Sequence, residues 1–183
     1  MKKILSTITL FISLNNSLFS SPMDGIWKQY IYTDGISSNY IFDVEKDNKG
    51  RVWIGTQNGV TLIEGKLIQK FGSSKGLPAA NIIKVVSVND KIYAATSTKG
   101  IYILGEDGFF NKTSIVKGSS LSTMEKVGDK LFVSTNLENI LHDGDNVSFM
   151  GKGFPNLKIK DVYVSGDKVW YAAEDRLIKK AGK

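Results

Sequence analysis

Four copies of one short pattern recur along this 183-residue chain at a nearly constant spacing. In each copy an aromatic residue is followed by a hydrophobic or small residue, a small residue, and then Thr or Ala. The copies begin at Trp53, Tyr93, Phe132 and Trp170, which lie 40, 39 and 38 residues apart. A steady period of about 40 residues predicts a repeat architecture. These four positions are called the repeat aromatics below.

Each repeat reads as a series of strands separated by tight turns. In the second copy, β-branched and aromatic runs cover residues 82–88, 91–96 and 101–104, and a fourth run begins at Phe109. Asn, Asp and Gly separate these runs, which is typical of β-hairpins. Four antiparallel strands in about 40 residues form one blade of a β-propeller. We therefore predict an all-β β-propeller built from four-stranded antiparallel blades. About four blades are expected, near residues 33–71, 74–113, 116–150 and 151–183.

Both ends of the repeat region carry an incomplete blade. Residues 25–32 resemble the fourth strand of the first blade, whereas the last blade stops after its third strand. Pairing these ends removes an open sheet edge. We therefore predict that the N-terminal strand completes the last blade and closes a four-bladed ring. Two alternatives remain: a homodimer that forms an eight-bladed ring if the four blades do not close, or a fragment of a longer propeller.

The first 21 residues have the outline of a secretory signal peptide. Lys2 and Lys3 precede an apolar run over residues 4–14, and small residues follow up to Ser21. The run of about 11 residues is shorter than the roughly 20 that span a bilayer. The expected domains are a signal peptide over 1–21 and a repeat domain over 22–183, located in the periplasm or secreted, with no membrane span after cleavage. An uncleaved anchor or a buried first strand is the alternative.

Composition argues against several classes of function. Loss of residues 1–21 lowers the net charge from +6 to +4, and the other lysines are scattered through turns, so no nucleic-acid partner is expected. Cysteine is absent, which excludes disulfides and thiolate chemistry. The single histidine, His142, has no second histidine with which to share a metal. We therefore expect no enzyme activity, no metal and no cofactor. A hydrolase or lyase that uses paired carboxylates is the weaker alternative.

Residues 34–60 carry a more specific motif. The sequence Asp-Gly-Ile-Ser-Ser-Asn at 34–39, the turn at 48–50 and Trp-Ile-Gly-Thr at 53–56 are similar to the two-component regulator propeller repeat. The second copy, from Lys75 to Thr96, matches well, and the third departs most. The resemblance implies a periplasmic ligand-sensing propeller for signal transduction. Such repeats often stand ahead of a transmembrane helix and a histidine kinase or diguanylate cyclase domain.

The functional expectation is an exported, non-catalytic sensor module that binds a small polar ligand. A protein-interaction scaffold, or a fragment of a longer propeller sensor, is the alternative. Candidate ligand contacts lie where the chain enters each innermost strand, because these connections ring the mouth of the axial channel. They are Ser37, Ser38, Asn39, Tyr40, Asn81, Ser120, Asn156 and Lys158.

A second set of polar residues interrupts the apolar inner strands. They are Asp43, Lys84, Thr123 and Asp161. Their charges either face a ligand in the channel or form salt bridges between neighbouring blades, because a buried charge must be paired. The repeat aromatics are expected to pack between blades as core residues, since they share one position in every repeat.

Overall fold

The computed structural model describes residues 27–116, 120–144, 146–150, 154, 157–166 and 168–180. These residues form four antiparallel sheets, one from each repeat, which we name blade 1 to blade 4. Blade 1 comprises β1 (Ile41–Lys46), β2 (Val52–Thr56), β3 (Gly59–Glu64) and β4 (Leu67–Phe71). Blade 2 comprises β5 (Ile82–Val88), β6 (Lys91–Thr96), β7 (Ile101–Leu104) and β8 (Phe110–Lys112). Blade 3 comprises β9 (Leu121–Val127), β10 (Lys130–Thr135), β11 (Asn139–His142) and β12 (Val147–Phe149). Blade 4 comprises β13 (Ile159–Ser165), β14 (Lys168–Ala173) and β15 (Leu177–Lys180). The predicted all-β propeller-blade architecture is confirmed.

Short polar turns join the strands where the sequence predicts them. Asn89 and Asp90, between β5 and β6, have φ values of 49° and 61°. Both residues thus adopt the left-handed conformation that a two-residue hairpin turn requires. Two short 3₁₀ turns, η1 (Tyr32–Asp34) and η2 (Ser73–Lys75), lead into blades 1 and 2.

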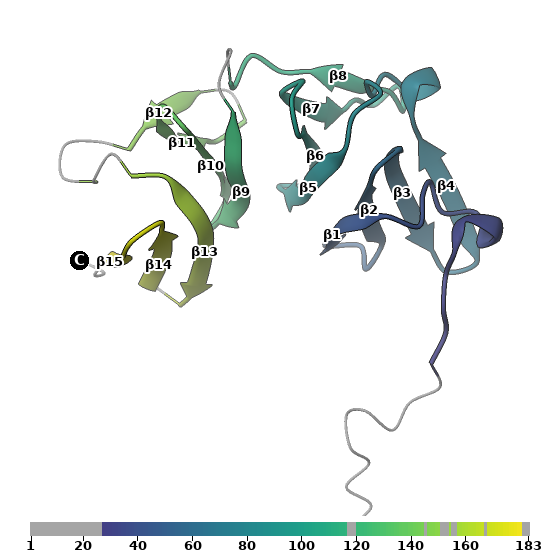
Figure 1. The fold of residues 1–183 in the computed structure, drawn as a ribbon, viewed down its shortest axis with the longest axis horizontal. Coiled ribbons are helices and arrows are strands. Elements are labelled where there is room, and N and C mark those ends of the chain that lie inside the picture. The colour runs from purple at the N-terminus through teal and green to yellow at the C-terminus, as the bar shows by residue number, and fades with distance from the viewer. Residues whose placement is uncertain are drawn as a thin grey trace, which may run out of the picture.

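The blades stand side by side in an arc, with the first strand of each on the inner side (Figure 1). The inner strands pack in chain order, β1 against β5, β5 against β9, and β9 against β13. Blades 1 and 4 lie at opposite ends of the arc and do not meet (Figure 1). The arc is therefore open.

The hydrophobic core lies between successive blades. Trp53, Tyr93 and Phe132 are fully buried, each in a cluster that includes apolar residues of the following blade. Phe132, for example, packs against Tyr171 of blade 4 with ring centroids 5.4 Å apart. Trp170 is only partly buried, because among the described residues no further blade packs against blade 4.

The predicted ring closure is wrong for the described residues. Blade 4 has three strands, and residues 27–31 form no strand. Local hydrogen bonds hold this segment beside blade 1: the Asp34 N–H donates to the Ile31 carbonyl at 2.9 Å, and the Tyr32 N–H donates to Asn39 Oδ1 at 2.6 Å. The chain therefore turns into η1 on its own blade instead of crossing to blade 4. The predicted signal peptide lies outside the described residues.

Candidate functional site

One end of every blade carries both the residue that precedes the inner strand and the turn between the second and third strands. Backbone hydrogen bonds join these two features in three blades: Gln57 N–H to the Tyr40 carbonyl, Ser97 N–H to Asn81, and Asn136 N–H to Ser120. These blade ends together form one face of the arc, which we call the mouth rim. Most of the predicted ligand contacts are located there.

In blade 1 several predicted contacts have structural roles. Ser37 is buried, and its hydroxyl donates to the Val60 carbonyl at 3.2 Å while accepting from the Thr61 hydroxyl at 2.8 Å. Ser38 is also buried, and its hydroxyl accepts from the Tyr40 N–H. The Asn39 amide oxygen is occupied by the Tyr32 N–H. These polar groups hold the loop before β1 in place.

The remaining predicted contacts are spread over the rim. Tyr40 and Lys158 are exposed, Asn81 is half-buried, and Asn156 lies outside the described residues. Among the described residues, no hydrogen bond joins the side chains of Tyr40, Asn81 and Lys158 to one another. No side-chain hydrogen bond in the described part of the chain therefore joins the predicted mouth residues of different blades.

A polar cleft of about 300 Å³ does open at the mouth rim, between blades 2 and 3. It is lined by Ser97, Thr98, Lys99, Gly100, Lys112, Val116 and Ser120. The Thr96 hydroxyl accepts from the Lys99 N–H and donates to the Gly100 carbonyl, which fixes the turn that carries Lys99. Among the described residues, no carboxylate forms an ion pair with Lys99 or Lys112. The cleft therefore offers two cations and several hydroxyls to a small ligand.

A related cleft lies one repeat earlier. It is lined by Tyr32, Ser37, Asn58, Lys70, Gly72, Ser73 and Ser74. Lys70 and Lys112 occupy equivalent positions on the fourth strands of their blades. Each pairs with a third-strand residue, and that residue in turn pairs with the residue directly after the repeat aromatic. The Lys70 ammonium lies over the Tyr32 ring, 4.6 Å from its centroid. That cation is thus already engaged, which leaves the cleft between blades 2 and 3 as the better ligand site.

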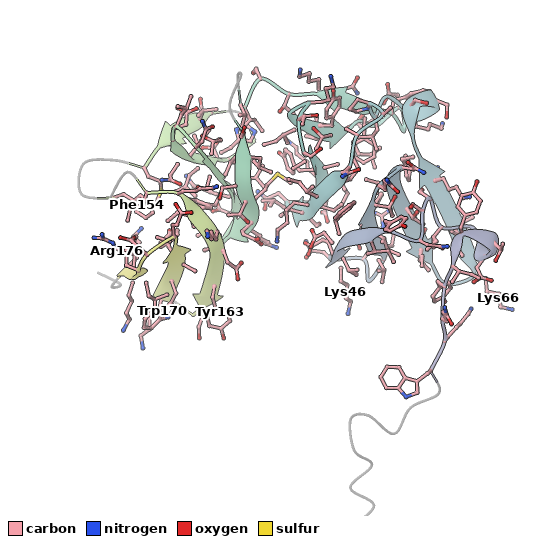
Figure 2. All side chains as sticks on the ribbon, viewed as in Figure 1. Lys46, Lys66, Phe154, Tyr163, Trp170 and Arg176 are labelled. Carbon is pink, nitrogen blue, oxygen red and sulfur yellow. The ribbon has the colours of Figure 1, made fainter. Side chains whose placement is uncertain are left out.

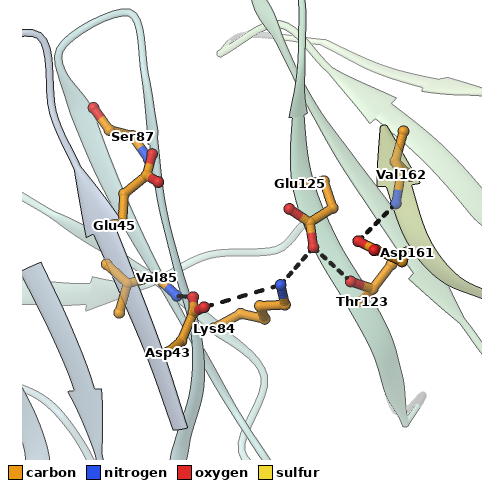
Figure 3. A network of polar contacts seen from close by, with 9 residues as sticks. All are labelled: Asp43, Glu45, Lys84, Val85, Ser87, Thr123, Glu125, Asp161 and Val162. Atoms are coloured by element: carbon orange, nitrogen blue, oxygen red, sulfur yellow. Dashed lines mark hydrogen bonds and ion pairs between the residues drawn. The ribbon is translucent and has the colours of Figure 1, made fainter. Parts of the chain in front are cut away.

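The polar residues of the inner strands form a network between blades (Figure 3). The Lys84 ammonium of β5 lies 2.5 Å from Glu125 Oε1 of β9 and 4.0 Å from Asp43 Oδ1 of β1. The Thr123 hydroxyl donates to the same Glu125 oxygen at 3.0 Å. Glu125 thus joins Lys84 to Thr123, and Asp43 contacts Lys84 directly. Asp161 takes no part in these contacts. The salt-bridge alternative thus fits Asp43 and Lys84 but not Asp161.

Carboxylates also cap backbone groups across the boundary between blades 1 and 2. Asp43 Oδ2 accepts from the Val85 N–H at 2.7 Å, and Glu45 Oε1 accepts from the Ser87 N–H at 2.9 Å. Burial raises the pKa of Glu45 more than the hydrogen bond from Ser87 lowers it. These contacts fix the angle at which blade 2 docks on blade 1.

Lys84 carries the positive charge on which this network depends. Burial lowers the pKa of its ammonium, but the hydrogen bond and charge of Glu125, with the charge of Asp43, outweigh burial and raise the pKa overall. Because the pKa of Lys84 is raised in the folded state, its interaction contributes its full stabilisation at pH values below the pKa that Lys84 has in the unfolded chain. The contribution is lost as pH rises through the pKa of the folded state.

Replacing Lys84 with methionine should therefore lower the free energy of unfolding by about 1–2 kcal/mol, because Glu125 and Asp43 lose their cation. Urea denaturation at pH 7 measures this change. A Lys160→Met variant is the control, since Lys160 pairs with Glu174 at an exposed position and should contribute less than about 0.5 kcal/mol. Equal losses of unfolding free energy in the two variants would show that the inner network stabilises the fold no more than an exposed ion pair does.

The described part of the chain lacks both a metal-binding cluster and a membrane-spanning helix. No group of three or more His, Cys, Asp and Glu side chains there is arranged to hold a metal ion. No helix there is long and apolar enough to cross a membrane. His142 is half-buried at the end of β11, where its ring packs edge-on against Tyr93 with centroids 6.2 Å apart.

Comparisons with known proteins agree with this fold and with the motif in blade 1. Residues 35–58 match the family model described as "Two component regulator propeller". Over 59 residues the chain is 30% identical to "Histidine kinase P4" of Formosa agariphila, which covers 32% of this chain and 4% of that protein. The sequence match is therefore local.

Solved structures of low sequence identity share the fold. The extracellular domain of the hybrid two component system BT4673 from B. thetaiotaomicron aligns over 84% of this chain and 22% of its own, with 15% identity and a TM-score of 0.64. The corresponding domain of BT3049 from the same organism aligns over 83% and 24%, with 16% identity and a TM-score of 0.61. Virginiamycin B lyase from Staphylococcus aureus aligns over 76% of this chain and 55% of its own, with 14% identity and a TM-score of 0.58.

This chain spans only a small part of the curated relative and of the two extracellular domains that it matches. The likeness to the solved structures lies in the fold, and the sequence motif of blade 1 adds the family resemblance. The described residues thus form an arc of β-propeller blades, and the first blade carries a two-component regulator propeller repeat.

Proposed function

We propose that this protein is an exported sensor-type module that binds a small, negatively charged polar ligand without covalent chemistry. The observation that carries the proposal is the polar cleft at the mouth rim, where Lys99 and Lys112 meet hydroxyl groups and have no carboxylate partner among the described residues. A volume of about 300 Å³ is at the lower end of the range for small-molecule sites.

The comparisons support the sensor role and the location. The family match is to a two-component regulator repeat, and two of the similar solved structures are extracellular domains of two-component systems. A propeller that senses a ligand needs a rigid scaffold with a polar site on its loops. The cleft between blades 2 and 3 has this position, because Ser97 to Gly100 form a turn and Ser120 precedes β9.

The proposal is tested by charge removal in the cleft. Citrate, glucuronate and sulfate serve as probes, first in a thermal-shift screen and then in titration calorimetry at low and high salt. The double variant Lys99→Gln/Lys112→Gln should weaken binding at least about tenfold, because hydrogen bonds to charged groups contribute roughly 1.5–3 kcal/mol each. Binding should also weaken as salt rises.

The control removes two exposed turn lysines, Lys49→Gln and Lys66→Gln, and changes the net charge by the same amount. It should leave the affinity of every probe unchanged. If both double variants bind equally, the ligand does not occupy this cleft. If none of the three probes binds the native protein, the proposed anionic ligand class is wrong.

A protein-interaction role is the second candidate. It is favoured by the open arc, whose two ends expose apolar side chains of blades 1 and 4. The similarity to virginiamycin B lyase is limited to the fold.

A further inference from the structure

Blade 4 exposes a face that the repeat elsewhere buries. Leu177 pairs with the residue two positions after the repeat aromatic, as Val60 and Ile101 do in blades 1 and 2. Val60 and Ile101 are 0% and 1% exposed, whereas Leu177 is 65% exposed. Tyr163 and Trp170 lie on the same face and extend away from blade 3 (Figure 2). Blade 4 therefore presents the surface on which a following blade would pack.

Blade 1 exposes the opposite face. Val44 pairs with the residue directly after the repeat aromatic, as Val85 and Met124 do in blades 2 and 3. Val85 and Met124 are 1% and 0% exposed because the preceding blade covers them, whereas Val44 is 60% exposed. Blade 1 therefore presents the surface that a preceding blade would cover.

The two faces are chemically complementary, as the boundary between blades 1 and 2 shows. There, the Asp43 carboxylate accepts from the Val85 N–H. In blade 4, Asp161 occupies the position that Asp43 has in blade 1. In blade 1, Val44 occupies the position that Val85 has in blade 2. Asp161 is exposed and accepts from the N–H of its neighbour Val162. A blade 1 docked on blade 4 therefore places the Val44 N–H next to the Asp161 carboxylate.

The N-terminal segment adds a second complementary element. Among the described residues blade 4 has three strands whereas the other blades have four, and no described strand pairs with the outer edge of β15. Residues 27–31 carry the sequence of a fourth strand but pair with none of the described strands, and Trp27 is highly exposed. An unpaired strand edge and an unpaired segment of matching sequence favour association.

A second copy of this chain satisfies all of these features at once. Within one chain the two faces stand at opposite ends of the arc and do not meet (Figure 1). The aligned part of the arc, 76% of this chain, covers 55% of the chain of virginiamycin B lyase. Head-to-tail contacts close into a ring when the rotation per subunit fits, and two copies close it if each spans half a turn.

We propose that two copies of this chain close a ring of eight blades. Blade 4 of each copy packs against blade 1 of the other, so the dimer has two equivalent interfaces. Residues 27–31 of each copy supply the missing strand of the other copy's blade 4. This inference is independent of the proposed ligand, because the cleft between blades 2 and 3 lies within one chain.

The oligomeric state of the purified full chain tests the proposal. Size-exclusion chromatography with light scattering should give twice the mass of one chain at micromolar concentration. Val44→Glu and Leu177→Glu each place a charge in both interfaces of the dimer, and each should raise the dissociation constant at least about 100-fold. Both side chains are exposed within one chain, so the folded monomer should persist by circular dichroism.

Mixing the two variants distinguishes this ring from other dimers. A heterodimer of Val44→Glu and Leu177→Glu has one native interface and one doubly altered interface, so the mixture should associate where each variant alone does not. Leu137→Glu is the control, since Leu137 is 62% exposed on the turn between β10 and β11, away from both faces, and should leave the dimer intact.

Three results would overturn the proposal. The first is a monomeric native protein, which would mean that no second copy covers these faces. The second is a mass that grows beyond two copies with concentration, because the contacts would then not close after two. The third is a dimer that survives both Val44→Glu and Leu177→Glu.

Discussion

Replacing Asp47 with alanine should lower the free energy of unfolding by about 3–4 kcal/mol. The Asp47 side chain is only 3% exposed and accepts four hydrogen bonds. Oδ1 accepts from the N–H groups of Lys49 and Arg51, both at 2.9 Å. Oδ2 accepts from Arg51 Nε at 2.7 Å and from the Trp53 indole at 2.9 Å. Alanine leaves the buried indole donor and the turn N–H groups without an acceptor.

Thermal and urea unfolding measure this loss, and the melting temperature should fall by on the order of 10 °C. Asp47→Asn keeps one acceptor oxygen and should cost less than the alanine variant. Asp107→Ala is the matched control: Asp107 accepts one hydrogen bond, from the Phe109 N–H in an exposed turn, and its loss should cost about 1 kcal/mol or less. Similar losses at Asp47 and Asp107 would mean that the four contacts of Asp47 contribute little.

The pH dependence of stability should change with the same substitution. Burial raises the pKa of Asp47, but the hydrogen bonds from Trp53 and Arg51 and the Arg51 charge outweigh burial and lower the pKa overall. A lowered carboxyl pKa gives stability that is present above the unfolded-state value of about 4 and is lost as pH falls through the folded-state value. The difference in unfolding free energy between the native protein and Asp47→Ala should therefore shrink in acid.

The sequence predicted the blades well because their signals are local. The period of the repeat aromatics and the turns rich in Asn, Asp and Gly depend on neighbouring residues, and both features appear in the sheets. Asp47 is not part of the repeat signal, although an Asp six residues before Trp53 is visible in the sequence. Its role depends on the turn that brings its carboxylate under the indole.

Ring closure could not be predicted in the same way, because it depends on long-range geometry. The fourth-strand pattern of residues 25–32 is visible, but its partner depends on the angles between blades and on where the segment docks. In the structure, the hydrogen bonds of Ile31, Tyr32 and Asn39 hold it beside blade 1.

The candidate sites were predicted only in part for a similar reason. Asp43, Lys84 and Thr123 share one repeat position, and their polar character was evident. Glu125, the partner of both Lys84 and Thr123, stands two residues further along its strand than Thr123, so its contact with Lys84 depends on how the blades pack. Lys112 lies on an outer strand, and its convergence with Lys99 depends on the pairing of β7 with β8. The equivalence of Lys70 and Lys112 in the repeat was the available signal.

The second large effect is expected from Gly59→Ala, which should lower the free energy of unfolding by at least about 3 kcal/mol. Gly59 begins β3 with a φ of 114°, a conformation that L side chains rarely adopt. A Cβ at this position would lie 2.1 Å from the carbonyl oxygen of Phe71 at the end of β4. Backbone atoms must therefore move to accept the methyl group.

Movement at Phe71 would not remain local. Its ring is buried between blades 1 and 2, 5.7 Å from the Trp53 ring and 5.6 Å from the Phe110 ring, measured between centroids. A shift of the end of β4 therefore disturbs the aromatic contacts that join the two blades, and the close packing of protein interiors makes such shifts costly. The loss should appear as a lower urea midpoint and as weaker near-ultraviolet circular dichroism from these rings.

Gly65→Ala separates this steric effect from backbone strain alone. Gly65 also has a positive φ, 59°, but a Cβ there would meet no atom within 4 Å. Its replacement should cost about 1 kcal/mol, since the left-handed conformation is the sole obstacle. A loss at Gly59 no larger than that at Gly65 would show that β4 moves freely away from β3. Gly76, in the loop before β5, has a separate approach of 2.1 Å to the Phe110 carbonyl oxygen of β8, so Gly76→Ala should cost a comparable amount through a second backbone clash.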